Sequence, residues 1–258
     1  MKKLIILLVT LFIGQQMMAQ GTHFTFNGTI EFEKTLNMYA LIKKEMTDDN
    51  DSFMQSIFDN YKKTNPQFKK LKSTLTFTKD KALFTPIVDE GPQNNSFFWS
   101  AAPTGQQTNT TFTDLTTGLS TTQKKVFEEM FLVKDSTRKI NWKITTETRD
   151  IAGYTCRRAN ALVMDSIYVV AFYTEEIPVS AGPESFTGLP GMILGVALPH
   201  DSMTWFATKV TDMTIPENKV VPPVKGKPVN NKQLRAKLDE AMSNWGGEGR
   251  TYLKVLLL

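Results

Sequence analysis

Few residues of this chain have the side chains that metal binding and acid–base catalysis most often use. His23 and His200 are the two histidines, and they lie far apart in the sequence. Histidine is the commonest transition-metal ligand and general base in proteins. The sequence also has no HExxH pair, phosphate-binding loop, dinucleotide fingerprint or G-x-S-x-G elbow. We therefore expect no metal and no cofactor. The sequence leaves the question of an enzyme open and favours a chain without catalytic activity, because no nucleophile, base and orienting group can be assigned.

Two acidic stretches have the composition of a catalytic carboxylate pair or a calcium-binding loop, but their spacing fits neither. Glu175 and Glu176 are adjacent, and adjacent strand residues point to opposite faces, so the pair makes a poor catalytic dyad. The run Asp48–Asp51 has the composition of a calcium loop, but its spacing fails because the required glycine position holds Phe53. We interpret this run as a solvated turn that caps the helix after it.

Cys156 is the single cysteine, so an exported chain of this kind has no disulfide framework and depends on its core. One interpretation is a small buried strand residue, the common fate of a free cysteine. The other is a reactive thiol whose pKa is lowered by Arg157 and Arg158. We favour the buried interpretation.

The first residues have the features of a secretory signal peptide. Lys2 and Lys3 precede a short apolar run, and residues 1–19 are expected to be cleaved off. We expect residues 20–258 to form a single β-rich domain, with a linker and a C-terminal helix over 212–258 and no transmembrane segment. Removing two lysines lowers the formal charge from +4 to +2, which gives no case for nucleic-acid binding. The expected location is periplasmic or secreted.

Most of the chain has the alternating pattern of β-strands. In Phe24–Phe32 one face would carry Phe24, Phe26, Ile30 and Phe32, and the strand is expected to continue to about Ile42. Leu71–Ile87 is expected to be a hairpin with its turn at Lys79-Asp80. The other expected strands lie within Thr111–Val133 and over Ile140–Thr145, Thr155–Leu162, Ser166–Thr174, Met192–Leu198, Asp201–Val210 and Tyr252–Leu258.

Two segments have helical spacing instead. Asp48–Tyr61 and Asn231–Trp245 are predicted to be amphipathic helices, and the four prolines of Pro216–Pro228 predict a surface linker before the second. The polar stretch Asp89–Thr111 is predicted to be a long loop that carries Phe97-Phe98-Trp99. The sequence is compatible with these aromatics being buried or exposed.

The stretch before Met192–Leu198 contains an explicit turn signal. Pro190 and Gly191 have the order of positions i+1 and i+2 of a type II turn over Leu189–Met192, so Gly191 is expected to have a positive φ. Leu189 is expected to pack in the core, with the alternative that it is an exposed contact residue. Ser166–Thr174 is apolar on both faces, so either a helix or an apolar cavity must cover its second face.

These segments carry a family resemblance. Ile151–Ala159, Phe172–Pro178, Gly182-Pro183 and Gly188-Leu-Pro-Gly-Met-Ile-Leu194 resemble the GLPGLI family, with Met192 where the family name has leucine and Phe172-Tyr173 in place of Trp-Tyr. The resemblance implies a secreted or periplasmic β-rich protein of outer-membrane bacteria and implies no reaction. The candidate binding residues from this stretch are Tyr154, Cys156, Phe172, Tyr173, Gly182, Pro183, Phe186, Gly188, Leu189, Pro190 and Gly191.

The strand pattern and the resemblance together predict a mainly β protein. We expect a curved antiparallel sheet or an open β-barrel resembling the lipoprotein-carrier fold, with one or two helices packed on it. Two functions remain open. The first is a periplasmic binding or carrier module whose apolar cavity holds a lipid, an acyl chain or an apolar peptide segment. The second is a protein partner of an outer-membrane assembly that uses the GLPG turn and the aromatic loop.

Overall fold

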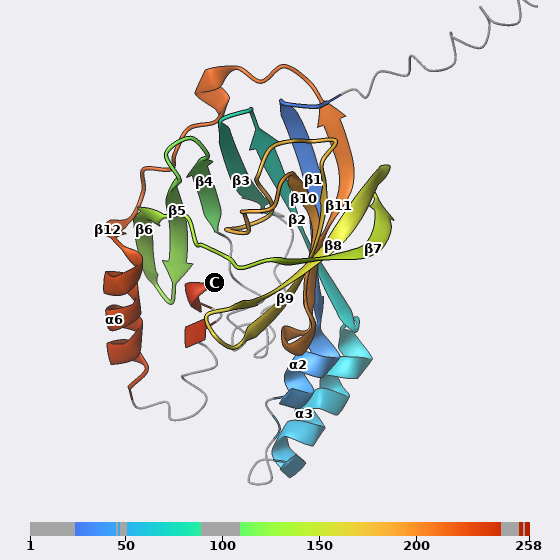
Figure 1. Ribbon diagram of the computed structural model, residues 1–258. Helices are drawn as coiled ribbons and strands as arrows, with labels where there is room; N and C mark the ends of the chain where they lie inside the picture. Colours follow the sequence, from blue (N-terminus) through green and yellow to red (C-terminus); the bar gives the residue numbers. More distant parts are fainter. Residues whose placement is uncertain (1–23, 45, 47–50, 89–108, 244–252, 255) are drawn as a thin grey trace, which may run out of the picture.

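The computed structural model describes residues 24–44, 46, 51–88, 109–243, 253–254 and 256–258 (Figure 1). Among these residues it has three α-helices, α2 Met38–Lys44, α3 Asp51–Thr64 and α6 Asn231–Ala241. The strands are β1 Gly28–Asn37, β2 Phe68–Phe77, β3 Lys81–Ile87, β4 Thr110–Asp114, β5 Leu119–Val126, β6 Glu129–Ser136, β7 Lys143–Ile151, β8 Tyr154–Val163, β9 Ile167–Thr174, β10 Met192–Leu198, β11 Met203–Asp212 and β12 Lys227–Val229. The predicted mainly β class is confirmed.

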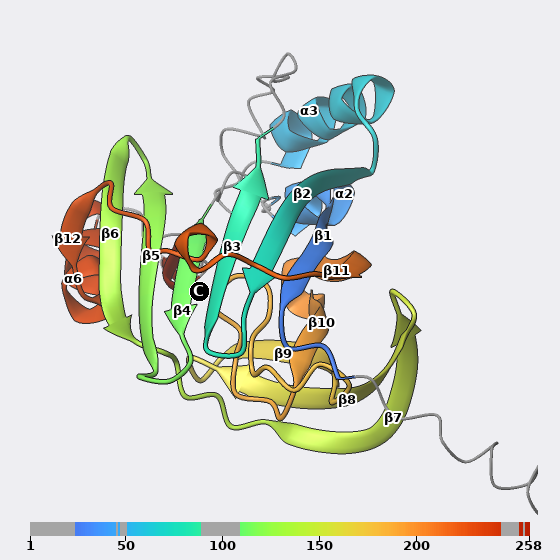
Figure 2. The same ribbon diagram turned by 90° about the horizontal axis from the view of Figure 1, so that it is seen from above.

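All twelve strands belong to one sheet that does not close. Their order is β12-β6-β5-β4-β3-β2-β1-β11-β10-β9-β8-β7, so β12 and β7 are the two edges. Neighbours pair antiparallel except at one edge, where β12 runs parallel to β6. Figure 2 shows that the sheet curls strongly, so that β7 and β8 run across the direction of β2 and β3. The chain between β9 and β10 and the last described residues lie inside this curve (Figure 1).

The first strand differs from its expected bounds at both ends. Ile30 and Phe32 are buried as predicted, but Phe24 and Phe26 precede the strand and are 48% and 40% exposed, so their assignment to the core face was wrong. The strand ends at Asn37, whose side-chain oxygen accepts a hydrogen bond from the main-chain N of Ala40 at 3.2 Å. This is the bond of a helix N-cap, and it turns the chain into α2 where a continued strand was expected.

The hairpin and the first amphipathic helix are confirmed. β2 and β3 pair from Phe77–Ala82 outward, with Lys79 and Asp80 between them. α3 packs on α2 through Tyr39, whose ring lies edge-on to Phe58 at 5.5 Å between centroids. Figure 1 shows the two helices together at one end of the sheet.

Several later segments differ from the sequence prediction. Ile140 and Trp142 lie before β7, and β7 is a largely exposed strand at the edge of the sheet. The predicted linker Pro216–Pro228 runs into β12, a strand that the prolines concealed. Leu253, Lys254, Leu256 and Leu257 are helical, so the final strand predicted over Tyr252–Leu258 was wrong. The predicted helix end near Trp245 and Phe97-Phe98-Trp99 lie outside the described residues.

The buried apolar side chains form two clusters. The larger one fills the space between β1, β2, β3, β8 to β11 and the helices α2 and α3. The smaller one joins β5, β6, β12 and α6 to the last residues, and its members are Val126, Phe131, Val133, Val229, Leu234, Leu238, Met242, Leu253, Leu256 and Leu257. Both faces of β9 are buried, as its sequence predicted. The candidate site lies beside the smaller cluster.

Candidate binding site

The residues singled out by the family resemblance are mainly core residues. The chain between β9 and β10 folds back on β10, where the main-chain N of Met192 donates to Ile177 O and that of Ile193 donates to Ala181 O. The buried members of the set are Cys156, Phe172, Tyr173, Gly182, Pro183, Phe186, Leu189 and Gly191. Tyr154 is partly buried, and Gly188 and Pro190 are exposed. Leu189 is 2% exposed, as expected of a core residue.

The two glycines of the GLPG turn have structural roles that differ from the expected ones. Gly188, not Gly191, has the positive φ, +93°. A side-chain Cβ at Gly191 would lie 2.1 Å from the main-chain O of Thr174, so this position needs glycine for close packing against the end of β9. The predicted type II turn with a left-handed Gly191 was therefore wrong, although the need for glycine there stands.

Cys156 lies on β8 with no exposed surface. Burial raises the pKa of its thiol to about 12, and the charges of Glu176 and Asp150 add to this effect. A thiolate is the reactive form of cysteine, so this environment opposes nucleophilic or redox chemistry. The buried interpretation fits these observations.

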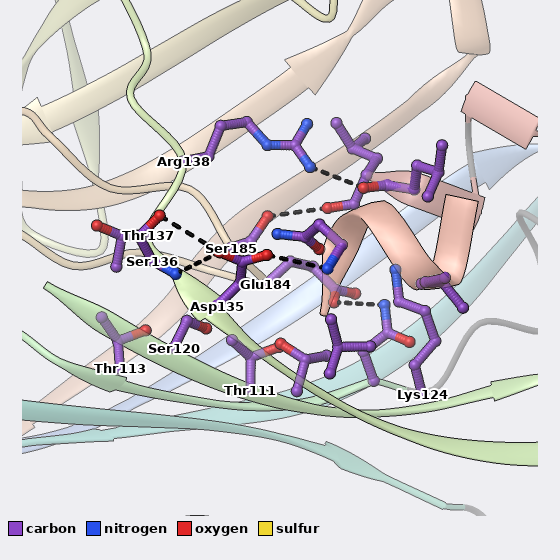
Figure 3. Close-up of a pocket in the computed structure, with 17 residues that line it drawn as sticks. Thr111, Thr113, Ser120, Lys124, Asp135, Ser136, Thr137, Arg138, Glu184 and Ser185 are labelled. Atoms are coloured by element: carbon purple, nitrogen blue, oxygen red, sulfur yellow. Dashed lines mark hydrogen bonds between the residues drawn. The ribbon is translucent and has the colours of Figure 1, made fainter. Parts of the chain in front are cut away.

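A polar pocket opens between β4, β5, the end of β6 and the chain around Glu184 (Figure 3). Its walls come from segments that are distant in the sequence, and its volume is about 60 Å³. Its lining residues are Asn109, Thr111, Thr113, Ser120, Thr122, Lys124, Val133, Asp135, Ser136, Thr137, Arg138, Glu184, Ser185, Asn231, Leu234, Leu257 and Leu258. Most of these side chains are polar, which differs from the apolar cavity expected from the sequence.

The β4–β5 hairpin places three of these side chains on one face. Asp114 accepts from the main-chain N of Thr116 at 3.0 Å and of Thr117 at 2.9 Å, and this closes the turn between the strands. Alternate residues of a strand share a face, so Ser120, Thr122 and Lys124 of β5 all line the pocket. The opposite side of the pocket is fixed by Asp135, which accepts from the main-chain N of Asn231 at 2.9 Å and so ties β6 to the start of α6.

Three side chains from separate parts of the chain bind three consecutive main-chain carbonyls. Lys124 Nζ donates to the O of Leu256 at 2.7 Å, Arg138 Nη2 to that of Leu257 at 2.7 Å, and Ser185 Oγ to that of Leu258 at 2.9 Å. Figure 3 shows the side chains of Arg138, Ser185 and Lys124 at the pocket, with the hydrogen bonds of Arg138 and Ser185 as dashed lines. We call Leu253, Leu256, Leu257 and Leu258 the leucine segment.

Lys124 is buried close to charged groups of both signs. Lys124 is 5% exposed, and burial lowers its pKa to about 8, with further lowering by the charges of Arg138 and Lys34 and an opposing effect of Glu184. Burial raises the pKa of Glu184, and Lys34 and Lys124 oppose that rise. Perturbed pairs of this kind are concentrated at functional sites, although structural networks also produce them.

Glu184 is held in an unusual backbone conformation. Its φ is +53°, in the left-handed region that costs a residue with a Cβ about 1 kcal/mol or more. Its carboxylate accepts from Asn109 Nδ2 at 3.2 Å, across 75 residues of sequence. We interpret this unfavourable backbone conformation as the one that directs the Glu184 carboxylate toward the pocket.

Two buried polar atoms in the pocket wall have no hydrogen-bond partner among the described residues. They are Oδ1 of Asn109, which is 5% exposed, and Nη1 of Arg138. Leaving such atoms unpaired costs about 1–3 kcal/mol each, and most buried polar groups in proteins are paired. One acceptor and one donor are thus available to a group that enters the pocket.

The arrangement is suited to binding and gives no clear reaction. Ser120 donates to the O of Phe112 and Ser185 donates to that of Leu258, so neither hydroxyl is paired with a base. No group of three or more His, Cys, Asp or Glu side chains that could hold a metal ion lies in the described part of the chain. His200 is exposed beside Tyr168, and His23 lies outside the described residues. No helix of the described chain is both long and apolar enough to cross a membrane.

Sequence reasoning missed the residues that form this pocket. Glu184 and Ser185 lie between Pro183 and Phe186, inside the stretch that was singled out, but they were not among the candidates. A signal was available, because Glu184 is the one charged residue between Glu176 and His200. Lys124 gave no signal, since it follows Thr-Thr-Gln and precedes Lys125 on a strand with a polar pattern.

Comparisons with known proteins give one family match and weak structural likenesses. A family model described as "Protein of unknown function (Porph_ging)" matches residues 162–195, from the end of β8 into β10. No curated protein sequence matches the chain. Two crystal forms of PNGF-II are similar at TM-scores of 0.49 and 0.48, with 15% and 13% identity, over 82% and 80% of this chain and 33% and 31% of theirs. The chain thus spans about a third of the length of PNGF-II.

A third solved structure has similar coverage and lower similarity. It is an uncharacterized conserved protein from Thermus thermophilus, with a TM-score of 0.38 and 4% identity over 80% of this chain and 91% of that one.

Proposed function

We propose that the chain is an exported binding module whose ligand site is the polar pocket between β4, β5, Arg138 and Glu184. The observation that carries the proposal is the pair of buried, unpartnered atoms in the pocket wall, Asn109 Oδ1 and Arg138 Nη1. Ligand atoms that accept from Arg138 Nη1 and donate to Asn109 Oδ1 would remove these penalties. The buried Lys124 beside them supplies a further donor.

The size of the pocket limits what it takes. A volume of about 60 Å³ accommodates a few water molecules or one small polar group, whereas sites for drug-sized ligands measure about 300–1,000 Å³. An acyl chain or a lipid does not fit this pocket as it stands. Of the ligands expected from the sequence, we therefore set aside the lipid and the acyl chain and propose a ligand that inserts a polar group here.

Export and family are part of the same proposal. The basic start and short apolar run of residues 1–19 support a cleaved signal peptide and a periplasmic or secreted location. The GLPGLI resemblance of Gly188–Leu194 supports the same location, and this motif lies within the stretch that the Porph_ging family model matches. Cleavage is tested by N-terminal sequencing of the envelope protein, which should begin near Gln20.

Native mass spectrometry tests the binding proposal. Protein purified gently from its own cells should carry a bound mass that is lost in Lys124→Met and kept in Lys125→Met. Lys125 is the matched control because it is the next residue of β5 and is exposed. An empty wild-type protein, or a bound mass that survives Lys124→Met, would contradict the proposal.

A further inference from the structure

The leucine segment is bound in the manner of a ligand. Its three carbonyls receive Lys124, Arg138 and Ser185, which come from β5, from the chain after β6 and from the loop before β10. Hydrogen bonds to main-chain carbonyls do not depend on the side chains of the peptide that is bound. Such a set of donors is therefore able to receive another peptide in the same place.

The apolar contacts supply side-chain selectivity. Leu253, Leu256 and Leu257 are buried in the smaller apolar cluster, against β5, β6 and α6. Removing apolar side chains from water is favourable, so these three buried leucines favour an apolar segment over a polar one. The donors fix the main chain, and the cluster selects leucine-like side chains.

The pocket has charges of both signs. Lys124 and Arg138 supply the positive charge of the pocket, and Glu184 and Asp135 offset it. The main chain of a peptide offers the carbonyl acceptors that Lys124, Arg138 and Ser185 bind here.

From these observations we propose that the pocket recognises an apolar peptide segment, and that the leucine segment is its intramolecular occupant, which an incoming peptide displaces. This rests on the proposed function and specifies its ligand class. The displaced state enlarges the pocket, because Leu257 and Leu258 form part of its wall. Apparent affinity for an added peptide is then reduced by the fraction of molecules in which the leucine segment is bound.

A labelled peptide tests the proposal on the full chain. The probe is dye-labelled Leu-Lys-Val-Leu-Leu-Leu, the sequence of residues 253–258, measured by fluorescence anisotropy. We expect the double variant Leu256→Ser, Leu257→Ser to bind it about tenfold or more tightly than the wild type, because the occupant is weakened. Adding Lys124→Met should abolish the gain, and adding Lys125→Met should leave it. A probe with serine at its leucine positions should not bind.

A milder variant keeps the test decisive if the double variant fails to fold. Leu256→Ala removes one buried side chain and should give a smaller gain in the same direction. Equal affinity of wild type and Leu256→Ala, or binding that ignores Lys124→Met, would overturn the proposal. If the labelled peptide does not bind but native mass spectrometry finds a bound mass that depends on Lys124, the proposed ligand class is wrong and the proposed binding function stands. If both fail, the pocket is not a binding site.

Discussion

At the scale of single residues, the GLPG motif acts through packing. Gly191 lies where the end of β9 leaves no space for a Cβ, and Leu189 is buried beneath it. Pro190 is exposed and restricts the chain before β10. The GLPG motif therefore stabilises the packing of the core. Glu184 and Ser185 lie a few residues earlier in the same loop.

The first prediction compares two neighbours in this motif. Gly191→Ala should lower the free energy of unfolding by about 1–3 kcal/mol, because the added methyl group must displace the main chain of Thr174. Pro190→Ala should cost only about 0.4–1 kcal/mol, mainly through the unfolded state. Urea unfolding of both variants measures the difference. Equal losses of stability in the two variants would show that the main chain of Thr174 moves away from the added methyl group without an energetic cost.

Leu189 gives a second test of the packing role. Leu189→Asp places a carboxylate where the wild-type side chain is 2% exposed, so the protein should unfold or lose most of its stability. Circular dichroism melting is the measurement. A melting temperature equal to that of the wild type would mean that Leu189 is free to turn outward and serve as a contact residue.

The thiol of Cys156 offers a third test. Its burial and its raised pKa predict slow labelling by a thiol reagent in the native protein at pH 8 and fast labelling in denaturant. Mass spectrometry of the labelled protein follows both rates. Fast native labelling would restore the reactive interpretation that Arg157 and Arg158 suggested.

The pH dependence of stability tests the environment of Lys124. Its pKa is about 8 in the folded protein and about 10.5 in the unfolded chain, so between these values the unfolded state binds more protons. Lys124 therefore makes stability rise with pH over this window, with a slope of up to about 1.4 kcal/mol per pH unit. Below about pH 8 both states are protonated and the slope vanishes.

The control is the difference between two variants. Lys124→Met should remove this part of the slope, and Lys125→Met should keep it, in urea titrations at pH values from 7 to 10. Lys69, whose pKa is also lowered by burial, is expected to contribute equally to both variants. Identical slopes for the two variants would place the Lys124 ammonium in solvent.

At the scale of elements, α6 holds one wall of the pocket. Asn230 caps the helix, because its side chain accepts from the main-chain N of Gln233 at 2.8 Å while the Gln233 side chain accepts from the main-chain N of Asn230 at 3.0 Å. Leu234 and Leu238 pack in the cluster that receives the leucine segment. The capped start, the tie to Asp135 and the parallel β12 together fix the helix against β6.

Loss of the cap should loosen this element first. Asn230→Ala is expected to cost about 1 kcal/mol and to increase hydrogen exchange in α6 and in the leucine segment more than in β8 and β9. Lys232→Ala, an exposed change in the same turn, is the control. A uniform rise in exchange over the whole chain would show that α6 and the sheet open as one unit.

The elements that the sequence predicted well are those with strict periodicity. The β2–β3 and β8–β9 hairpins, α3 and β10 follow from alternation, turn residues and helical spacing alone. The misses have local causes. Asn37 caps a helix where an apolar strand pattern continues, and β12 is a strand of three residues that includes Pro228.

At the scale of the whole molecule, the site depends on contacts that no local pattern reveals. Lys124 and Leu256 are 132 residues apart, and Asn109 and Glu184 are 75 apart. The curl of the sheet brings these residues to one interior, so a lysine on a polar strand becomes a buried donor (Figure 2). The sequence predicted the curved sheet. It also predicted an apolar cavity, whereas the pocket beside β4 and β5 is lined mainly by polar side chains, which resemble a solvated face in the sequence.

The central claim is that a ligand binds at the interior face of β5. Site-specific photo-crosslinking in the cell of origin tests it most directly, with a small diazirine amino acid placed at Thr122, which lines the pocket, or at the neighbouring Thr121, which does not. Melting curves confirm that both proteins are folded before their adducts are identified by mass spectrometry. The account predicts a specific adduct from position 122 and none from position 121. No adduct at 122, or the same adduct at both positions, would contradict it.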